Sequence, residues 1–208
     1  MKIISRTVGF VETNCYLAWD ENTKKAFIID PGDYSPELDK TIESEGLSLE
    51  YIILTHGHGD HIGGLDKFLE LHPEAKLAAG EAEAPLLSSA KLNFTAAIVG
   101  REIETTPDLF LKDGDELDVG GLKLKIIETP GHTPGGISIY IEKEGVLFSG
   151  DTLFDKSIGR TDLPGGDFRQ LITSIKEKLF VLPDDTKIYP GHMSATGIGS
   201  EKEGNPFV

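Results

Sequence analysis

The sequence predicts an α/β (α+β) fold in which two mixed β-sheets pack face to face with helices outside. Short apolar runs bounded by turn residues recur along the chain, as is typical of strands. In each half, several hairpin-type strands lead into an alternation of strand and helix. The 208 residues contain no linker or sharp change in composition, so we expect one domain over 1–208.

The first half is expected to hold five strands and three helices. The strands are expected at 3–10, 14–19, 25–30, 50–55 and 76–79, and the helices at 36–44, 62–71 and 81–90. Ser35 should cap the first helix, because a serine hydroxyl accepts an N–H of the first helical turn. Residues 91–107 form either a loop or a lid near the functional site.

The second half is expected to be richer in strands. The strands are expected at 116–119, 122–128, 137–142, 146–149 and 186–189, and a helix at 167–180. The residues after His192 are expected to be loop or a short turn.

Composition narrows the function classes. The net charge of −15 disfavours nucleic acid and anionic membranes as partners. No run of about 18 apolar residues occurs, and the first residues lack the pattern of a signal peptide, so we expect a cytoplasmic protein. Cys15 is the single cysteine and is expected to be a buried, unreactive thiol. Oligomeric state is not predicted.

Four possible metal ligands lie in one strand-to-helix turn. They are His56, His58, Asp60 and His61. Imidazole and carboxylate groups are ligands that zinc prefers. His56 and His58 are two residues apart, so in extended backbone they point to the same side. His61 opens the following helix and is aimed elsewhere, which suggests a second metal ion.

Three further ligands follow other predicted strands. They are His132, Asp151 and His192. Strand ends gather along one sheet edge, so we expect two ligand sets to meet there. The first set is His56, His58 and His132; the second is Asp60, His61 and His192, with Asp151 bridging both.

We therefore expect two divalent metal ions per chain, with zinc as the first choice and iron or manganese as alternatives. Asp60 and Asp151 are the expected catalytic carboxylates, and a hydroxide that bridges the two ions is the expected nucleophile.

These motifs resemble the metallo-β-lactamase superfamily, and specifically the short form of its glyoxalase II-like (hydroxyacylglutathione hydrolase-like) branch. The resemblance rests on residues 55–61, 130–135, 150–154 and 190–192. It implies a four-layer αββα sandwich with a binuclear site at one edge, and hydrolysis of a small-molecule thioester. It also implies that Asp30 supports the metal ligands by fixing the orientation of a histidine. The alternative is that Asp30 only forms the turn before Pro31 and Gly32.

Two residues are candidates for substrate binding. Arg160 lies in a segment that resembles the one in which glyoxalase II places a lysine against glutathione; an ion pair with Asp162 or Asp155 is the alternative. Lys202 lies in a tail similar to that of short glyoxalase II-like proteins, with a solvated side chain as the alternative. Met193 and Ser194 stand where a tyrosine is expected, so the resemblance does not fix glutathione as the thiol.

A persulfide dioxygenase of the same fold is the alternative function. Residues 159–162 also resemble that family, in which two histidines and one aspartate hold a single iron. Here these residues would be His56, His132 and Asp151. A protein that binds metal without catalysis is the non-enzymatic alternative.

Overall fold

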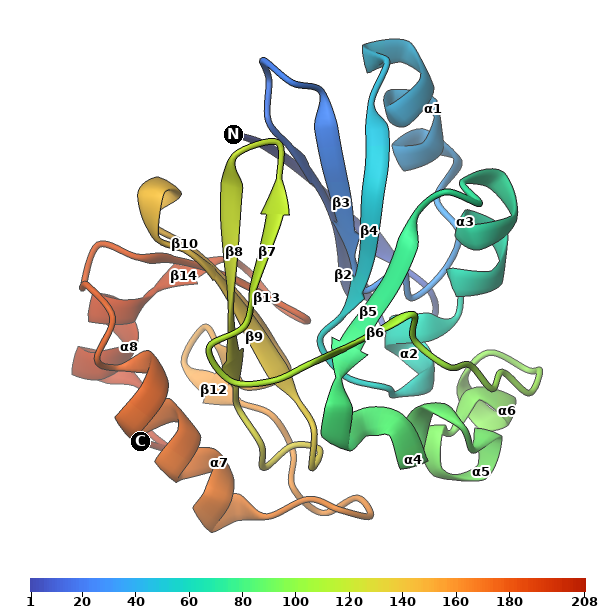
Figure 1. Cartoon of the computed structure of the whole chain (residues 1–208). Coiled ribbons are helices and arrows are strands. Elements are labelled where there is room, and N and C mark those ends of the chain that lie inside the picture. Colours follow the sequence, from blue (N-terminus) through green and yellow to red (C-terminus); the bar gives the residue numbers. More distant parts are fainter.

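Two six-stranded mixed β-sheets form the middle of the molecule (Figure 1). The computed structural model describes all residues from 1 to 208. The first sheet has the strand order β1 (Lys2–Val8), β2 (Thr13–Trp19), β3 (Lys25–Ile29), β4 (Ser48–Leu54), β5 (Lys76–Gly80), β6 (Leu109–Leu111). The second has the order β14 (Thr196–Gly197), β13 (Lys187–Pro190), β10 (Val146–Gly150), β9 (Ile137–Ile141), β8 (Leu122–Glu128), β7 (Glu116–Val119). A separate hairpin pairs β11 (Leu153–Phe154) with β12 (Ser157–Ile158).

Helices cover the outer faces of both sheets (Figure 1). Beside the first sheet lie α1 (Pro36–Glu45), α2 (Gly59–Ile62) and α3 (Leu65–Leu71). Beside the second lie α7 (Phe168–Ser174), the π-helix η3 (Ile175–Leu179) and α8 (Ile198–Gly204). The short elements are η1 (Glu81–Glu83), α4 (Ala84–Leu87), α5 (Ala90–Asn93), α6 (Thr95–Ile98) and η2 (Glu142–Glu144). None of these helices combines the length and apolarity needed to span a bilayer.

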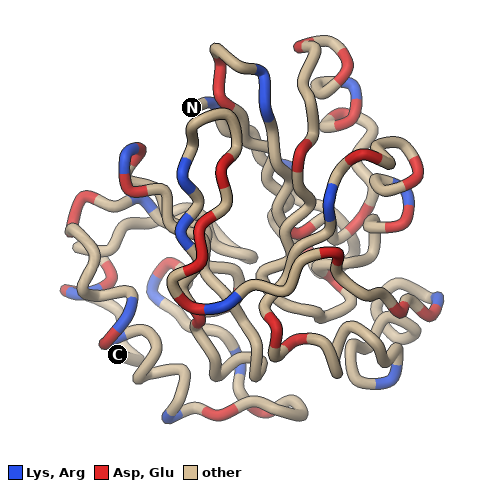
Figure 2. The backbone as a smooth tube through the Cα atoms, viewed as in Figure 1, with Lys and Arg blue, Asp and Glu red and all other residues tan.

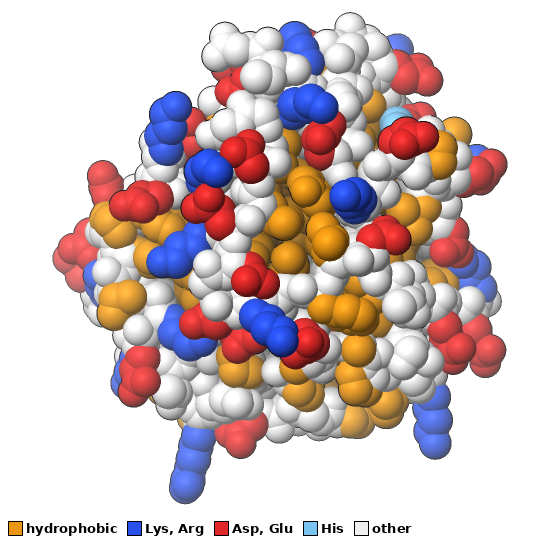
Figure 3. All heavy atoms as spheres, viewed as in Figure 1, with side chains coloured by type: hydrophobic (Ala, Val, Ile, Leu, Met, Phe, Trp, Pro, Cys, Tyr) orange, Lys and Arg blue, Asp and Glu red, His pale blue; other side chains and the backbone are white.

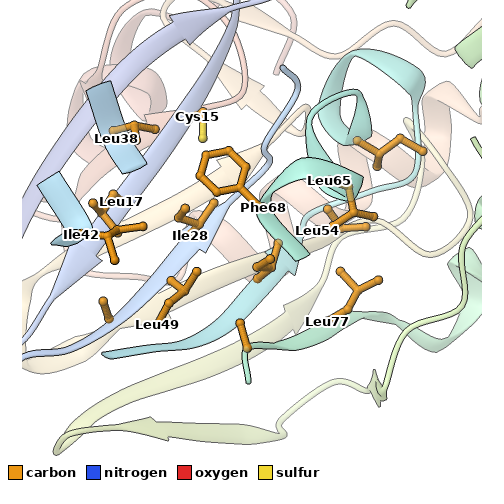
Figure 4. Close-up of a cluster of buried hydrophobic side chains, with 14 of the residues drawn as sticks. Cys15, Leu17, Ile28, Leu38, Ile42, Leu49, Leu54, Leu65, Phe68 and Leu77 are labelled. Atoms are coloured by element: carbon orange, nitrogen blue, oxygen red, sulfur yellow. The ribbon is translucent and has the colours of Figure 1, made fainter. Parts of the chain in front are cut away.

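Alternation along the strands produces three buried clusters. Side chains of successive strand residues point to opposite faces of a sheet. In β3, Phe27 therefore faces the other sheet, whereas Ile28 faces the helices. Figure 4 shows Phe68 of α3 directed at the helix-facing cluster around Ile28. A third cluster packs α7 and α8 against the second sheet. Three apolar interfaces between four layers confirm the predicted αββα sandwich.

Local signals place α1 as predicted. The Ser35 hydroxyl accepts the N–H of Leu38 at 3.4 Å, and Pro36 occupies the first helical position. Gly46, with φ of +64°, ends the helix in the left-handed conformation. The predicted capping of this helix by Ser35 is confirmed.

Several predicted helices are broken into shorter pieces. The helix predicted at 62–71 is interrupted at Gly63 and Gly64, because the chain there packs directly on another loop. A Cβ on Gly64 would lie 2.3 Å from the backbone carbon of Asp33. The helix predicted at 81–90 is divided among η1, α4 and the start of α5, and the last turns of the one at 167–180 form the π-helix η3.

Other elements were not predicted. The tail is not loop, because residues 198–204 form α8. The strands β6 and β14 are only three and two residues long, and so carry almost no periodic signal. Residues 91–107, predicted as a loop or lid, begin with most of α5 and the whole of α6 before the chain becomes irregular.

Most charged side chains lie on the outside of the molecule; Asp30, Glu83 and Glu201 are buried exceptions. Asp and Glu are spread along loops and outer elements of both halves, with Lys and Arg between them (Figure 2). On the face shown in Figure 3, basic and acidic groups alternate around a central apolar area, so this face has no continuous basic surface. Cys15 is buried, as predicted, and burial raises the pKa of its thiol, which keeps the sulfur protonated and unreactive.

Because Phe148 packs in the interface between the sheets, we expect its removal to destabilise the protein strongly. Its ring is fully buried and lies 5.3 Å from the ring of Tyr16 and 6.1 Å from that of Phe27. We expect Phe148→Ala to lower the free energy of unfolding by about 3–5 kcal/mol in urea titrations. Phe10→Ala is the control, since Phe10 is 95% exposed; its effect should stay within about 0.5 kcal/mol. Equal effects of the two substitutions would contradict this packing.

Candidate metal centre

The ends of four strands bring the seven predicted ligands to one edge of the sandwich. Loops after β4, β8, β10 and β13 carry histidines or aspartate, and α2 carries Asp60 and His61. Three groups of these residues have ligand atoms within 4.8 Å of one another: His56, His58 and His132; Asp60, His61 and His192; and His56, His61 and Asp151. The structure thus gathers residues that lie up to 136 positions apart (192 − 56).

The first predicted set converges tightly. His132 Nε2 lies 2.9 Å from His58 Nδ1 and 3.2 Å from His56 Nε2. All three side chains are buried. Zn–N bonds of 2.0–2.1 Å in tetrahedral geometry put ligand atoms about 3.3 Å apart. The three nitrogens are therefore spaced as ligands of one ion are.

The second set lies beside the first, and Asp151 lies between them. Asp60 Oδ2 is 3.2 Å from His192 Nε2 and 3.6 Å from His61 Nε2. Asp151 Oδ1 is 3.4 Å from His61 Nε2, while Oδ2 is 3.6 Å from His132 Nε2. One carboxylate thus faces both sets, which is the geometry predicted for a bridging ligand.

We call the seven predicted ligands the cluster: His56, His58, Asp60, His61, His132, Asp151 and His192. Hydrogen bonds on the outer side of the histidine rings fix which ring nitrogens face this cluster. His132 Nδ1 lies 2.7 Å from the carbonyl oxygen of Arg160. A carbonyl only accepts, so Nδ1 carries the proton and Nε2 presents its lone pair to the other ligands. His56 Nδ1 likewise lies 3.2 Å from the hydroxyl of Thr55, which donates its own proton to Asp30.

Asp30 lies behind the ligands, where the resemblance placed it. The carboxylate is 1% exposed and accepts from the Thr55 N–H at 2.7 Å and the Thr55 hydroxyl at 2.6 Å. Its Oδ2 lies 2.9 Å from His61 Nδ1, so the Nε2 of that ring faces Asp60 and Asp151. One buried carboxylate therefore orients His61 directly and His56 through Thr55.

The electrostatics of the cluster suit a cation. Burial, together with the neighbouring His132 and His61, lowers the pKa of His58 to about 4, so its ring is neutral at pH 7. Burial opposes charge on His61 as well, but the carboxylates of Asp151, Asp30 and Asp60 outweigh it and raise its pKa. The buried atoms His61 Nε2 and Asp151 Oδ1 have no hydrogen-bond partner. A divalent ion would satisfy both, so the donor set fits a metal.

A cavity of about 370 Å³ gives access to the cluster. Five cluster residues form one wall, and the other walls are mainly apolar. These other residues are Val11, Phe94, Ile98, Phe154, Ser157, Ile158, Arg160, Leu163 and Met193. Segment 91–107 therefore does reach the site, through Phe94 and Ile98. A larger cavity of about 880 Å³, near Tyr140 and Lys187, includes no cluster residue.

The two substrate-binding candidates lie in different places. Arg160 lines the cavity, and its guanidinium pairs with both oxygens of Asp162 at 2.7 and 2.8 Å, which is the ion pair named as the alternative. Lys202 lies in α8 and bonds Asp184 at 2.6 Å, and it does not line the cavity. The structure therefore does not bring Lys202 to the site. The sixth histidine, His72, lies outside the cluster, 2.8 Å from Asp39.

Sequence reasoning missed several supporting residues. Thr13 donates to Asp60 Oδ2 at 3.2 Å across 47 positions, and no local pattern marks such a contact. Tyr16 donates to the Pro190 carbonyl at 2.6 Å and so holds the loop before His192. Gly191 stood in a recognised motif, and its role is steric: a Cβ there would lie 2.2 Å from Asp151 Oδ1.

The sequence of this chain matches a known protein family. The model of the metallo-beta-lactamase superfamily matches residues 8–192. Hydroxyacylglutathione hydrolase GloC of Haemophilus influenzae is 39% identical over 198 residues, which cover 95% of this chain and 93% of the relative. The probable metallo-hydrolase YqgX of Bacillus subtilis is 37% identical over 209 residues, covering 100% and 98%.

Solved structures agree with this placement. The B3 metallo-beta-lactamase BLEG-1 superimposes with a TM-score of 0.91 at 38% identity, over 99% of both chains. TTHA1623, in a di-iron-bound form, has a TM-score of 0.86 at 33% identity, over 99% of this chain and 100% of that one. ETHE1 from Myxococcus xanthus has a TM-score of 0.73 at 31% identity, over 98% and 83%.

The position of Asp30 predicts that it supports metal affinity without binding the metal. Asp30→Asn keeps the size of the side chain but removes the charge that holds His61 and Thr55. We expect the affinity for zinc, measured by competition with a chromophoric chelator, to fall about 10–100-fold. Asp155→Asn is the control, because Asp155 is an exposed carboxylate in the β11–β12 turn. Unchanged affinity in Asp30→Asn would show that the contact has no role in metal binding.

Proposed function

This chain belongs to the metallo-beta-lactamase superfamily, and on that basis we propose that it is a binuclear metal-dependent hydrolase of thioesters, of the hydroxyacylglutathione hydrolase (glyoxalase II) type. The observation that carries the proposal is the pair of ligand sets joined by Asp151. Two complete sets around one carboxylate fit a two-ion site better than a single ion. The similarity to GloC, whose name states this activity, supports the substrate class.

The ligands divide between two divalent cations, for which zinc is our first proposal and iron or manganese the alternatives. His56, His58 and His132 would hold one ion, and Asp60, His61 and His192 the other. Nitrogen and carboxylate donors accept all three metals, and a similar structure holds two irons. When bound, such a pair lowers the pKa of a shared water towards about 7 and polarises a carbonyl oxygen.

The protein's own groups would position the reacting molecules. Asp60 lies between Thr13 and His192 and also lines the cavity, so it can accept a hydrogen bond from the attacking water. Asp151, shared by both sets, adds negative charge that offsets two cations. Apolar side chains at the cavity mouth, such as Phe154 and Met193, would pack against the acyl or thiol part of the substrate and exclude bulk water.

Persulfide dioxygenase remains the second candidate, because ETHE1 shares the fold at 31% identity. That function would need one iron on His56, His132 and Asp151. The close approach of Asp60, His61 and His192 favours the hydrolase, since a one-iron site leaves these three residues without a role. Metal analysis separates the two: two ions per chain with thioester cleavage, or one iron with oxygen consumption on a persulfide.

Removal of a ligand should abolish turnover while the protein stays folded. We expect His58→Ala and Asp151→Ala to hydrolyse S-lactoylglutathione at less than about 1% of the wild-type rate, because each loses part of the site that activates water. Metal content, measured by mass spectrometry, should fall in both. His72→Ala is the matched control, since His72 lies outside the cluster. Near wild-type turnover in either ligand variant would refute the assignment.

The position of Arg160 at the cavity leads us to expect that it strengthens the binding of anionic substrates only. The Arg160 guanidinium is paired with Asp162, but the side chain is 61% exposed and lines the cavity. It can therefore bind a carboxylate on the thiol portion of the substrate. We expect Arg160→Ala to raise KM for S-lactoylglutathione about tenfold and to leave kcat, and KM for an uncharged thioester, unchanged. Lys202→Ala should change neither, because that lysine lies outside the cavity. An equal rise in KM for both substrates would refute charge recognition.

A further inference from the structure

Glu83 is a fully buried carboxylate that lies outside the proposed ligand sets. It is the last residue of η1, directly after β5, and its side chain is 0% exposed. A carboxylate is costly to bury unless hydrogen-bond donors surround it. The donors around Glu83 come from two distant loops, and these are the loops that carry ligands.

Each oxygen of Glu83 holds a different ligand loop. Oε2 accepts the N–H of Gly57, which lies between His56 and His58, at 3.1 Å. Oε1 accepts the N–H of Gly135 at 2.9 Å and the hydroxyl of Thr133, the residue after His132. One side chain thus joins the loop of the first two histidines to the loop of the third.

The second ligand set has different supports. Asp60 is bonded by Thr13, and His61 by Asp30. The loop before His192 is held by Tyr16. None of these bonds involves Glu83. Asp30 supports both sets, since it also orients His56 through Thr55, whereas Glu83 bonds only to the loops of the first set. We therefore expect a change at Glu83 to act mainly on the first set.

We propose that Glu83 is a positioning residue that sets the spacing between the loops of His56, His58 and His132, and so determines the affinity of the three-histidine site for its ion. The inference rests on the proposed function, because it concerns that same metal site. All three partners of Glu83 are donors, so only two acceptor oxygens satisfy them. A glutamine in its place turns an NH₂ group towards one of the loops.

The test measures stepwise metal binding rather than activity. Apo protein is titrated with zinc against a chromophoric chelator, and His58→Ala identifies the step that belongs to the three-histidine site. In Glu83→Gln we expect that step to weaken about 10–100-fold, and the other step to stay within about threefold of wild type. Visible spectra of the cobalt(II)-loaded protein should change for the same site only.

Glu201→Gln is the matched control. Glu201 is also a buried carboxylate, 1% exposed, and it accepts from the Lys156 N–H at 3.0 Å, the Thr196 hydroxyl at 2.6 Å and the Asn205 amide at 2.9 Å. None of these partners is a proposed ligand or its neighbour. If Glu83 had a purely structural role, Glu83→Gln and Glu201→Gln would both lose thermal stability. Neither variant would then weaken one zinc-binding step more than the other.

The outcomes separate this proposal from the proposed function. Two unchanged steps in Glu83→Gln, or an equal loss in both steps, would overturn the role of Glu83 while the metal site stands. Wild-type protein that binds no second ion would instead overturn the two-ion site. If Glu83→Gln does not fold, Thr133→Ala removes one of its three donors, and a smaller weakening of the same step is then the expected result.

Discussion

The close approach of five imidazole rings and two carboxylates is the constraint on which the rest of the structure depends. The nitrogens of three rings lie 2.9 and 3.2 Å apart, and a carboxylate oxygen faces each set. Converging lone pairs and negative charges repel one another unless a cation lies between them. The backbone carbonyl behind His132 and the carboxylate behind His61 prevent the rings from turning away.

The sandwich provides the rigid support that this cluster needs. Two sheets pack through Tyr16, Phe27 and Phe148, and the ends of their strands open onto the same edge. Five of the seven predicted ligands lie on loops, and Asp60 and His61 lie on the short helix α2. Loops are mobile unless something holds them. Asp30 and Glu83 do this from the buried side: the first orients rings, and the second joins two loops.

Much of this was visible in the sequence, because local patterns carry it. The order of strands and helices predicted the layers, and the turn at 55–61 supplied four candidate ligands that the structure brings close together. Contacts between distant residues were not visible: the three partners of Glu83 lie 26, 50 and 52 positions away, and its neighbours resemble an ordinary helix start. The helix α8 has no capping side chain at its start and is held instead by contacts of Glu201 with Lys156 and Thr196. The position of Lys202 in this helix, outside the cavity, was likewise not visible from local sequence patterns.

Anomalous X-ray diffraction from a crystal of zinc-loaded protein tests the central claim most directly. We expect two peaks per chain, about 3.5–4 Å apart, with Asp151 between them. One peak should mark an ion held by His56, His58 and His132, and the other an ion held by Asp60, His61 and His192. A single peak, or peaks outside this cluster, would contradict the two-ion site and the hydrolase mechanism built on it.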